Sequence, residues 1–464
     1  MNQEQNNLNK PQDGGATRRE FLKKSTLAAA AVAASASIFK TPVYGQTQAP
    51  STGRVIGAND RIQVGYIGTG GQGMAHVNIQ KENAAANNIV QIASCDLSET
   101  RRQNAKAVIG ANCKLYNNHE EILANPDVDA VTIATVDHWH CRVAMAALEA
   151  GKHVYVEKPM TRYLQEAFDL HDTVKKTGKI LQVGSQGCTA AAWHKAAELI
   201  QANKIGTPVW AQGYYCRNNP NGEWNYPIQP WASQPGDLNW DKWQEPVKDK
   251  KALDPDAYFR WRKYYPYCAG LLGDLVPHRL LPLMLATGKP EYPVRVCSLG
   301  AKNCHTDKNT PNTPERDCPE QIELLAEFPS GMQLLIVSSS VAARSPGFSI
   351  YGHEATLEIG DSGERVKLIP EKPYSEDIDL ATFDGLSPIE DIGAHEKNWF
   401  DCIRTNKQPN AGIDLGTKAQ VVISLAEMSN RLNMMCLFDE STRKVSTMEG
   451  KEVAAITYGT LARS

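Results

Sequence analysis

The feature that most constrains the fold is a glycine cluster, GTGGQG at residues 68–73, which lies between two segments of different character. The segment before it, IQVGYI at 62–67, is a short apolar, β-branched run typical of a buried strand. The segment after it, MAHVNIQKE, is typical of a helix. Glycines at such a junction let backbone N–H groups approach a ligand, and the helix N-terminus adds partial positive charge. The junction therefore predicts a strand–turn–helix unit that binds an anionic group.

Strands and helices continue to alternate after this unit. The further expected strands are 89–95, 129–134, 153–157 and 180–184, and the further expected helices are 138–150 and 164–176. Gly151 follows the helix at 138–150 as a C′ glycine would. Alternation of this kind predicts a parallel, doubly wound α/β sheet.

The glycine cluster has the spacing G-x-G-x-x-G with one additional glycine, and its members are Gly68, Gly70, Gly71 and Gly73. Asp96 ends the next expected strand, 23 residues after Gly73. In dinucleotide-binding folds such glycines admit the pyrophosphate, and the carboxylate accepts hydrogen bonds from the ribose hydroxyls. Because a carboxylate here repels a 2′-phosphate, the pattern predicts NAD rather than NADP as cofactor. The alternative is a tight turn that binds nothing.

Residues 129–160 carry the most specific motif of the chain. They read DAVTIATVDHWHCRVAMAALEAGKHVYVEKPM and end in Glu157-Lys158-Pro159-Met160. Together with the glycine motif, this stretch resembles the Gfo/Idh/MocA oxidoreductase family, which includes glucose–fructose oxidoreductase and inositol dehydrogenase. The resemblance covers roughly residues 60–435.

The resemblance implies a Rossmann domain that binds NAD at 51–185, after an N-terminal signal and linker at 1–50. At 186–464 it implies a substrate and oligomerisation domain, an α/β unit with a large, mainly antiparallel sheet. We expect a homo-oligomer by the same analogy. The cofactor-binding residues expected beyond the glycine motif and Asp96 are Thr135, His140, Glu157 and Lys158.

Lys158 follows the expected strand 153–157 directly. A cation at this place lies at the C-terminal edge of a parallel sheet, where ligands of such folds bind. The resemblance implies that Lys158 lies near the nicotinamide and hydrogen-bonds the reacting hydroxyl. The alternative is a solvated loop lysine.

The second half carries a second candidate catalytic pair in GLLGDLVPH, residues 270–278. Asp274 and His278 are four residues apart and share one face if a helix begins here, with Asp274 as N-cap and Pro277 in the first turn. The resemblance implies that both reach the substrate, with His278 as general base and Asp274 orienting the ring or bonding a neighbouring hydroxyl. Pro282 is expected to break or kink this helix.

Residues 210–267, here called the aromatic segment, hold fourteen of the thirty-four aromatic residues of the chain. Aromatic faces stack on the C–H faces of sugars, so one hypothesis is a carbohydrate-binding wall. The other is packing within the loop or against a second subunit. Arg260 and Arg262 are candidates for bonding hydroxyls or a carboxylate, with surface salt bridging as the alternative.

Other classes of function have less support. The net charge of −3 with mixed signs gives no case for nucleic acid or an anionic membrane. The eleven cysteines have no zinc spacing, and His138 and His140 are two residues apart, so they do not share a helix face; no metal site is expected. The residues considered for a disulfide are Cys297, Cys304 and Cys318, with buried free thiols as the favoured alternative.

The N-terminal stretch TRREFLKKSTLAAAAVAASASIF, residues 17–39, is typical of a signal peptide. Its TRREFLK matches the twin-arginine export consensus, so the export machinery is an expected partner and the periplasm the expected location. The apolar run of fourteen residues from Thr26 to Phe39 is shorter than the roughly 20 needed to span a bilayer, and no membrane anchor is expected.

These patterns predict an exported NAD-dependent oxidoreductase acting on a hydroxyl of a sugar, cyclitol or glycoside, with tightly bound cofactor. One alternative is an NAD-dependent glycosidase that oxidises the sugar transiently. The other is a sugar-binding protein without catalytic activity.

Overall fold

The structure is a computed structural model that describes residues 61–458 except 234–235 and 389. The expected export signal at 17–39 lies outside the described residues. Within the described part of the chain, no helix is both long and apolar enough to cross a membrane.

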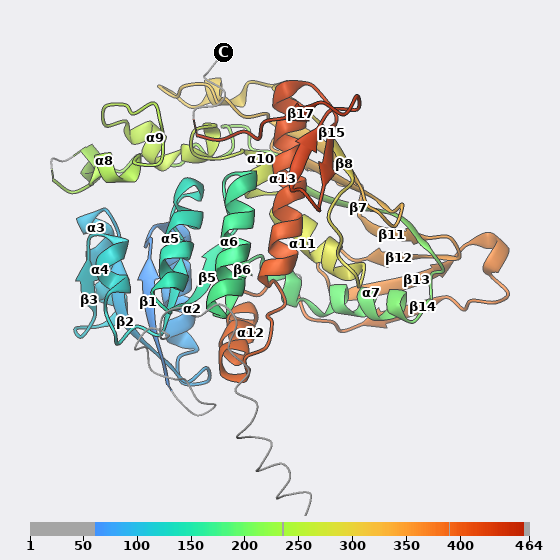
Figure 1. Cartoon of the computed structure of the whole chain (residues 1–464), viewed down its shortest axis with the longest axis horizontal. Helices are drawn as coiled ribbons and strands as arrows, with labels where there is room; N and C mark the ends of the chain where they lie inside the picture. Colours follow the sequence, from blue (N-terminus) through green and yellow to red (C-terminus); the bar gives the residue numbers. More distant parts are fainter. Residues whose placement is uncertain (1–60, 234–235, 389, 459–464) are drawn as a thin grey trace, which may run out of the picture. The chain divides into compact units, whose positions relative to one another are not determined.

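The first sheet has six parallel strands in the order β3-β2-β1-β4-β5-β6, so the expected doubly wound sheet is confirmed (Figure 1). Its strands are β1 Ile62–Ile67, β2 Ile89–Cys95, β3 Lys114–Tyr116, β4 Ala130–Ile133, β5 His153–Glu157 and β6 Leu181–Gly184. Its helices are α2 Gly71–Glu82, α3 Glu99–Ile109, α4 His119–Leu123, α5 Asp137–Glu149 and α6 Leu164–Thr177. The strand order reverses between β1 and β4, which is where ligands bind in such sheets.

The second sheet has eleven strands in the order β14-β13-β12-β11-β7-β10-β9-β8-β15-β16-β17. Its strands are β7 Pro208–Cys216, β8 Arg295–Ala301, β9 Gln321–Glu327, β10 Gln333–Ser339, β11 Phe348–Gly352, β12 Ala355–Ile359, β13 Arg365–Pro370, β14 Ala381–Asp384, β15 Cys436–Asp439, β16 Lys444–Ser446 and β17 Glu452–Val453. Only β7 and β10 pair in parallel among these, so the expected mainly antiparallel sheet is confirmed. The strands β9 and β10 form an antiparallel hairpin.

Helices connect the two sheets and cover them. They are α7 Ala191–Gln201, α8 Trp240–Trp243, α9 Pro255–Phe259, α10 Leu271–Asp274, α11 Pro277–Ala286, α12 Ile392–Thr405 and α13 Ile413–Leu432. The α13 helix packs against α6 on one side and β8 on the other, so it lies between the two sheets (Figure 1). Gly412 is the N-cap of α13, and Asp414 pairs with Lys175 of α6, so both have structural roles.

The segment with the expected catalytic pair differs from the sequence expectation. Asp274 is the last residue of the short α10 rather than an N-cap, and α11 begins at Pro277 after the N-cap Val276. The helix continues through Pro282 to Ala286 instead of ending there. A proline leaves the carbonyl four residues earlier without its helical donor. Here Arg279 Nη1 donates to that carbonyl, the His278 oxygen, at 3.4 Å.

A buried ion pair fastens α13 to the loop after β5. Arg162 donates to Glu427 through both terminal nitrogens, at 2.6 and 2.8 Å, and both side chains are almost fully buried. A bidentate guanidinium–carboxylate pair fixes orientation as well as distance. Because Arg162 is four residues after Lys158, the pair also fixes the course of the Lys158 loop.

We expect Arg162→Met to lower the free energy of unfolding by about 3 kcal/mol, because it leaves the buried Glu427 carboxylate with Arg431 as its remaining cationic partner. Lys397→Met removes the exposed Lys397–Asp401 pair and is expected to change it by less than about 1 kcal/mol. Urea denaturation of the two variants measures the difference. Equal effects would contradict the assignment of Arg162 as a structural link.

Candidate active site

The glycine turn has two members whose role is steric. Gly68 has φ +85°, and a Cβ on it would lie 2.6 Å from the Ala134 carbonyl oxygen. A Cβ on Gly73 would lie 2.0 Å from the Gly68 carbonyl oxygen. Both glycines therefore allow α2 and the loop after β4 to approach the turn. A Cβ on Gly71 would meet no atom within 4 Å, so its backbone faces open space.

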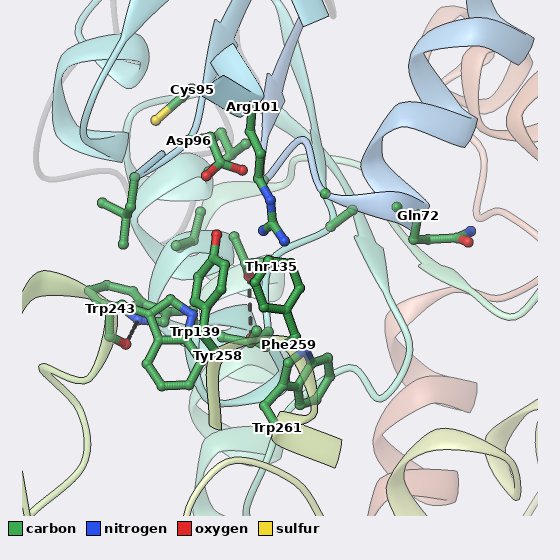
Figure 2. Close-up of a pocket in the computed structure, with 18 of the residues that line it drawn as sticks. Gln72, Cys95, Asp96, Arg101, Thr135, Trp139, Trp243, Tyr258, Phe259 and Trp261 are labelled. Carbon is green, nitrogen blue, oxygen red and sulfur yellow. Dashed lines mark hydrogen bonds between the residues drawn. The ribbon is translucent and has the colours of Figure 1, made fainter. Parts of the chain in front are cut away.

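A cavity of about 590 Å³ lies at the C-terminal edge of the parallel sheet (Figure 2). Residues of the first half that line it include Gly68, Gly70, Gly71, Asp96, Arg101, Thr135 and Trp139. Residues after 185 that line it include Tyr226, Trp243, Tyr258, Phe259, Trp261 and Arg262. The expected nucleotide site is thus a real cavity, and the aromatic segment forms its second wall.

Asp96 lies at the end of β2 as expected, and its carboxylate lines the cavity. Its Oδ2 accepts from Thr69 N at 2.8 Å and its Oδ1 from Ser98 N at 2.9 Å. These bonds fix the carboxylate against the glycine turn. Each oxygen keeps a further lone pair that a ribose hydroxyl can use.

Thr135 lines the cavity, whereas His140 does not. The His140 ring is buried, with Nδ1 2.7 Å from the Pro159 carbonyl and Nε2 3.2 Å from the Thr135 carbonyl. It joins the loop after β4 to the loop after β5. The structure therefore gives His140 a bridging position behind the two loops instead of a place on the cavity wall.

Glu157 is buried below the lysine rather than exposed to the cavity. Its Oε1 lies 2.9 Å from Nε2 of His76, and the other ring nitrogen lies 2.6 Å from Glu396. Gln72, which lines the cavity, also donates to Glu157 Oε1 at 3.1 Å. The imidazole thus links α2, β5 and α12, and Glu157 holds the Lys158 backbone through Oε2 at 3.2 Å.

The charges of this buried cluster reinforce one another. Burial lowers the pKa of His76, but hydrogen bonds to Glu157 and Glu396 outweigh it and raise the pKa to about 10. Burial raises the pKa of Glu157, but His76 outweighs it and lowers the pKa to about 2. At neutral pH the cluster therefore holds an imidazolium beside an ionised carboxylate.

Lys158 and Asp274 come together at the end of β5. The Lys158 ammonium donates to Oδ1 and to the backbone oxygen of Asp274, both at 2.7 Å. Arg262 Nε donates to Oδ1 at 2.8 Å, and the buried Trp224 donates to Oδ2 at 2.9 Å. Burial raises the pKa of Asp274, but Arg262 and Lys158 outweigh it and hold the pKa well below its usual range. Asp274 is therefore an ionised anchor for two cations.

His278 is not among the hydrogen-bond partners of Asp274 in the described structure. Its Nδ1 lies 3.3 Å from Glu390 Oε1, and its ring lies 5.4 Å from that of Tyr215. Burial and the charge of Lys158 lower the pKa of His278, while Glu390 opposes this shift. The imidazole is therefore neutral at neutral pH and able to accept a proton, with Glu390 rather than Asp274 as its carboxylate neighbour.

The aromatic segment has two roles. Trp240, Trp243, Tyr258, Trp261, Tyr264 and Tyr267 belong to a separate buried cluster, which confirms packing within the loop. Three of these residues, Trp243, Tyr258 and Trp261, also line the cavity that holds the glycine turn. Arg260 is buried and bonds Asp256 and the Tyr226 carbonyl, and Arg262 bonds Asp274, so the expectation of surface salt bridges for these arginines is wrong.

The cysteines and His138 have structural surroundings. All eleven cysteines lie in the described part of the chain and are free, eight of them buried, so no pairing of Cys297, Cys304 and Cys318 is present. Among the described residues, no group of three or more histidine, cysteine or acidic side chains is placed to hold a metal ion. His138 bonds the Trp243 carbonyl at 2.9 Å and belongs to the packing of the aromatic segment.

Comparison with known proteins supports the nucleotide-binding assignment. Residues 62–185 match the model of the GFO_IDH_MocA oxidoreductase family, with an NAD-binding Rossmann fold. The fit is chemically consistent, because the open Gly71 backbone, the Asp96 carboxylate and the cavity volume suit a dinucleotide. Residues 62–185 therefore have the sequence and the fold of an NAD-binding Rossmann domain.

Two relatives show the range of related activities. A glycosyl hydrolase family 109 protein of Shewanella sp. (strain ANA-3) is 34% identical over 240 residues, 45% of this chain and 52% of that protein. An inositol 2-dehydrogenase/D-chiro-inositol 3-dehydrogenase of Lactiplantibacillus plantarum is 29% identical over 160 residues, 34% of this chain and 45% of that protein. The chain spans about half the length of these relatives.

A solved structure extends the fold comparison to most of the chain. Levoglucosan dehydrogenase in complex with NADH and levoglucosan superposes with a TM-score of 0.62 at 18% identity. The match covers 81% of this chain and 99% of that protein. It shows that the two halves share the fold of that enzyme.

We expect His76→Gln to destabilise the protein in a pH-dependent way. Because the folded pKa of about 10 exceeds the usual 6.5, the charge stabilises the native state fully below about pH 6.5 and less as pH rises toward 10. The deficit in free energy of unfolding is therefore largest near pH 6 and shrinks toward pH 10. Urea denaturation at several pH values measures it, with exposed His353→Gln as control. A deficit that stays constant over this range would contradict the assignment.

Proposed function

We propose that this chain is an NAD-dependent oxidoreductase that acts on a hydroxyl of a sugar, cyclitol or glycoside and holds its cofactor tightly. The observation that carries the proposal is the Lys158–Asp274 pair at the C-terminal end of β5. Neither residue lines the cavity, but Arg262 lines it and bonds Asp274, and so connects the pair to the cavity. The relatives named for inositol dehydrogenation and the fold match with levoglucosan dehydrogenase support this substrate class.

The chemistry of Lys158 follows from its contacts. Two of its three N–H groups are used by Asp274, which leaves one for a substrate oxygen. Burial lowers its pKa, but Asp274 outweighs this effect and raises it, so the ammonium stays charged. A charged donor fixed beside the reacting oxygen stabilises the negative charge that develops there when the proton leaves.

His278 is the proton acceptor of the proposal. Its lowered pKa keeps the imidazole neutral, and a neutral imidazole takes the hydroxyl proton as the C–H hydrogen leaves as hydride. NAD supplies the acceptor for that hydride when bound. Asp274 contributes by holding Lys158 and Arg262 rather than by handling a proton.

The second candidate is a glycosidase reaction, favoured by the 34% identity to a family 109 glycosyl hydrolase. Transient oxidation of a sugar hydroxyl acidifies the neighbouring C–H bond. Elimination then expels the glycosidic leaving group, water adds, and the returned hydride restores the hydroxyl, so there is no net oxidation. The same lysine and histidine serve the first step of both reactions.

We expect Lys158→Met and His278→Gln each to lower turnover by roughly 10²–10⁴-fold, because each removes a group that acts on the reacting hydroxyl. The matched controls Lys397→Met and His353→Gln change exposed side chains that do not line the cavity, and they are expected to leave turnover unchanged. Absorbance of NADH with sugars and cyclitols, and p-nitrophenol release from glycosides without added NAD, measure the two reactions.

The outcomes separate the candidates. Nitrophenol release without net NADH favours the glycosidase, and NADH formation favours the dehydrogenase. Unchanged activity in both variants would contradict a catalytic role for Lys158 and His278, and the absence of both reactions in the native protein would favour a sugar-binding protein.

We also propose a periplasmic location, supported by the twin-arginine pattern at residues 17–39. That route carries folded proteins, which suits an enzyme that receives its cofactor in the cytoplasm. We expect cell fractionation to place the native chain in the periplasm and an Arg18→Lys, Arg19→Lys variant in the cytoplasm. Periplasmic recovery of that variant would contradict the proposed route.

A further inference from the structure

One cation on the cavity wall, Arg101, has no counter-ion among the described residues. Of the cationic side chains that line the cavity, Lys242 pairs with Glu120 and Glu245, and Arg262 pairs with Asp274. The Arg101 guanidinium has no hydrogen-bond or ion-pair partner within the described part of the chain. A half-buried guanidinium with five donors and no acceptor favours an anionic ligand.

Arg101 points at the glycine turn. Its Nη1 would lie 3.1 Å from a Cβ on Gly70, so the guanidinium covers the backbone of that glycine. Figure 2 shows its side chain directed into the cavity toward Phe259 and Tyr258, with Asp96 beside it. The helix α2 begins at Gly71, so Arg101 and the α2 N-terminus face the same space. Both features favour negative charge at this point.

The second half of the chain holds Arg101 in this position. The guanidinium carbon lies 4.7 Å from the ring centre of Tyr258 and 6.0 Å from that of Phe259. Trp231 adds a third ring at 5.7 Å. Stacking on aromatic faces restricts an arginine without using its N–H donors. The donors thus remain directed at the cavity.

Asp237 joins the same part of the chain to the first turn of α3, on which Arg101 lies. Its carboxylate accepts from Ser98 Oγ at 2.5 Å and from Thr100 Oγ1 at 2.6 Å, and its backbone oxygen accepts from Glu99 N at 3.0 Å. Leu238 continues this contact as a β-bridge to Ser98. These bonds fasten the wall of the cavity to the residues that follow Asp96.

We propose that Arg101 binds the pyrophosphate of the dinucleotide and that the aromatic segment, fastened by Asp237, retains the cofactor by holding this arginine over the glycine turn. The ligand chemistry is a diphosphate diester. The contact with Gly70 places the guanidinium at the glycine turn, and the Asp96 carboxylate repels a 2′-phosphate; both favour the pyrophosphate. This inference rests on the proposed dinucleotide dependence and does not depend on the substrate or on catalysis.

The first test is fluorescence titration with NADH and with NADPH of protein stripped of its cofactor. We expect Arg101→Met to weaken NADH binding by at least about tenfold, as for loss of a hydrogen bond to a charged group, and Arg101→Lys to weaken it less. Lys106→Met removes a charge from the same helix outside the cavity lining and is expected to leave binding unchanged. Unchanged NADH affinity in Arg101→Met, or an equal loss in Lys106→Met, would overturn the proposal. A loss confined to NADPH would overturn the pyrophosphate assignment.

The second test measures the release of bound NADH by stopped-flow displacement. We expect Asp237→Ala to release NADH at least about fivefold faster, because the variant loses the carboxylate that accepts hydrogen bonds from Ser98 and Thr100 and so loosens the fastening. Asp241→Ala changes an exposed carboxylate of the same segment and is expected to keep the native rate. Equal release rates for all three proteins would overturn the retention role. Both tests measure NADH binding, so their results can be interpreted even if the proposed sugar oxidation is wrong.

Discussion

The arrangement of the site depends on one carboxylate, that of Asp274. It accepts hydrogen bonds from Lys158, Arg262 and Trp224 at 2.7–2.9 Å, which satisfies both oxygens. Two buried cations this close would repel each other without it, and a buried charge is tolerated only when it is paired. The position of the lysine at the end of β5 is therefore set by the second half of the chain rather than by the parallel sheet alone.

The second half also completes the nucleotide cavity. A parallel sheet supplies the glycine turn, the Asp96 carboxylate and a helix N-terminus, which are enough to locate a dinucleotide but leave one side open. In this chain the aromatic segment closes that side with Tyr258, Phe259 and Trp261. Because Arg262 of the same segment bonds Asp274, the wall of the cavity and the anchor of Lys158 belong to one packed unit. Cofactor binding and the geometry at Lys158 are thereby mechanically connected.

The sequence predicted the parts of the structure that local pattern determines. Periodicity located the apolar strands, and the glycine spacing and Asp96 located the cavity, because these depend on residues close together in the chain. It did not predict the partners of Asp274 or the environment of His76, because those contacts join residues 12 to 320 positions apart. The spacing of Asp274 and His278 suggested a shared helix face, but a break between α10 and α11 separates them. Signals for Arg101, Trp224 and Glu390 were absent, since an arginine, a tryptophan or a glutamate in a loop or on a helix has no distinctive local pattern.

The net charge of Lys158, Arg262 and Asp274 affects both candidate reactions. Lys158 and Arg262 with Asp274 leave one net positive charge, and this charge favours the neutral form of His278 and an anionic substrate oxygen. Removal of a hydroxyl proton is the first step of simple oxidation and of the glycosidase route alike, so these residues do not distinguish the two. The distinction depends on whether the substrate carries a leaving group next to the acidified C–H bond. The choice between the two reactions therefore depends on which substrate binds. That is determined by the aromatic segment and the loop that carries Glu390, and not by the proton-transfer residues.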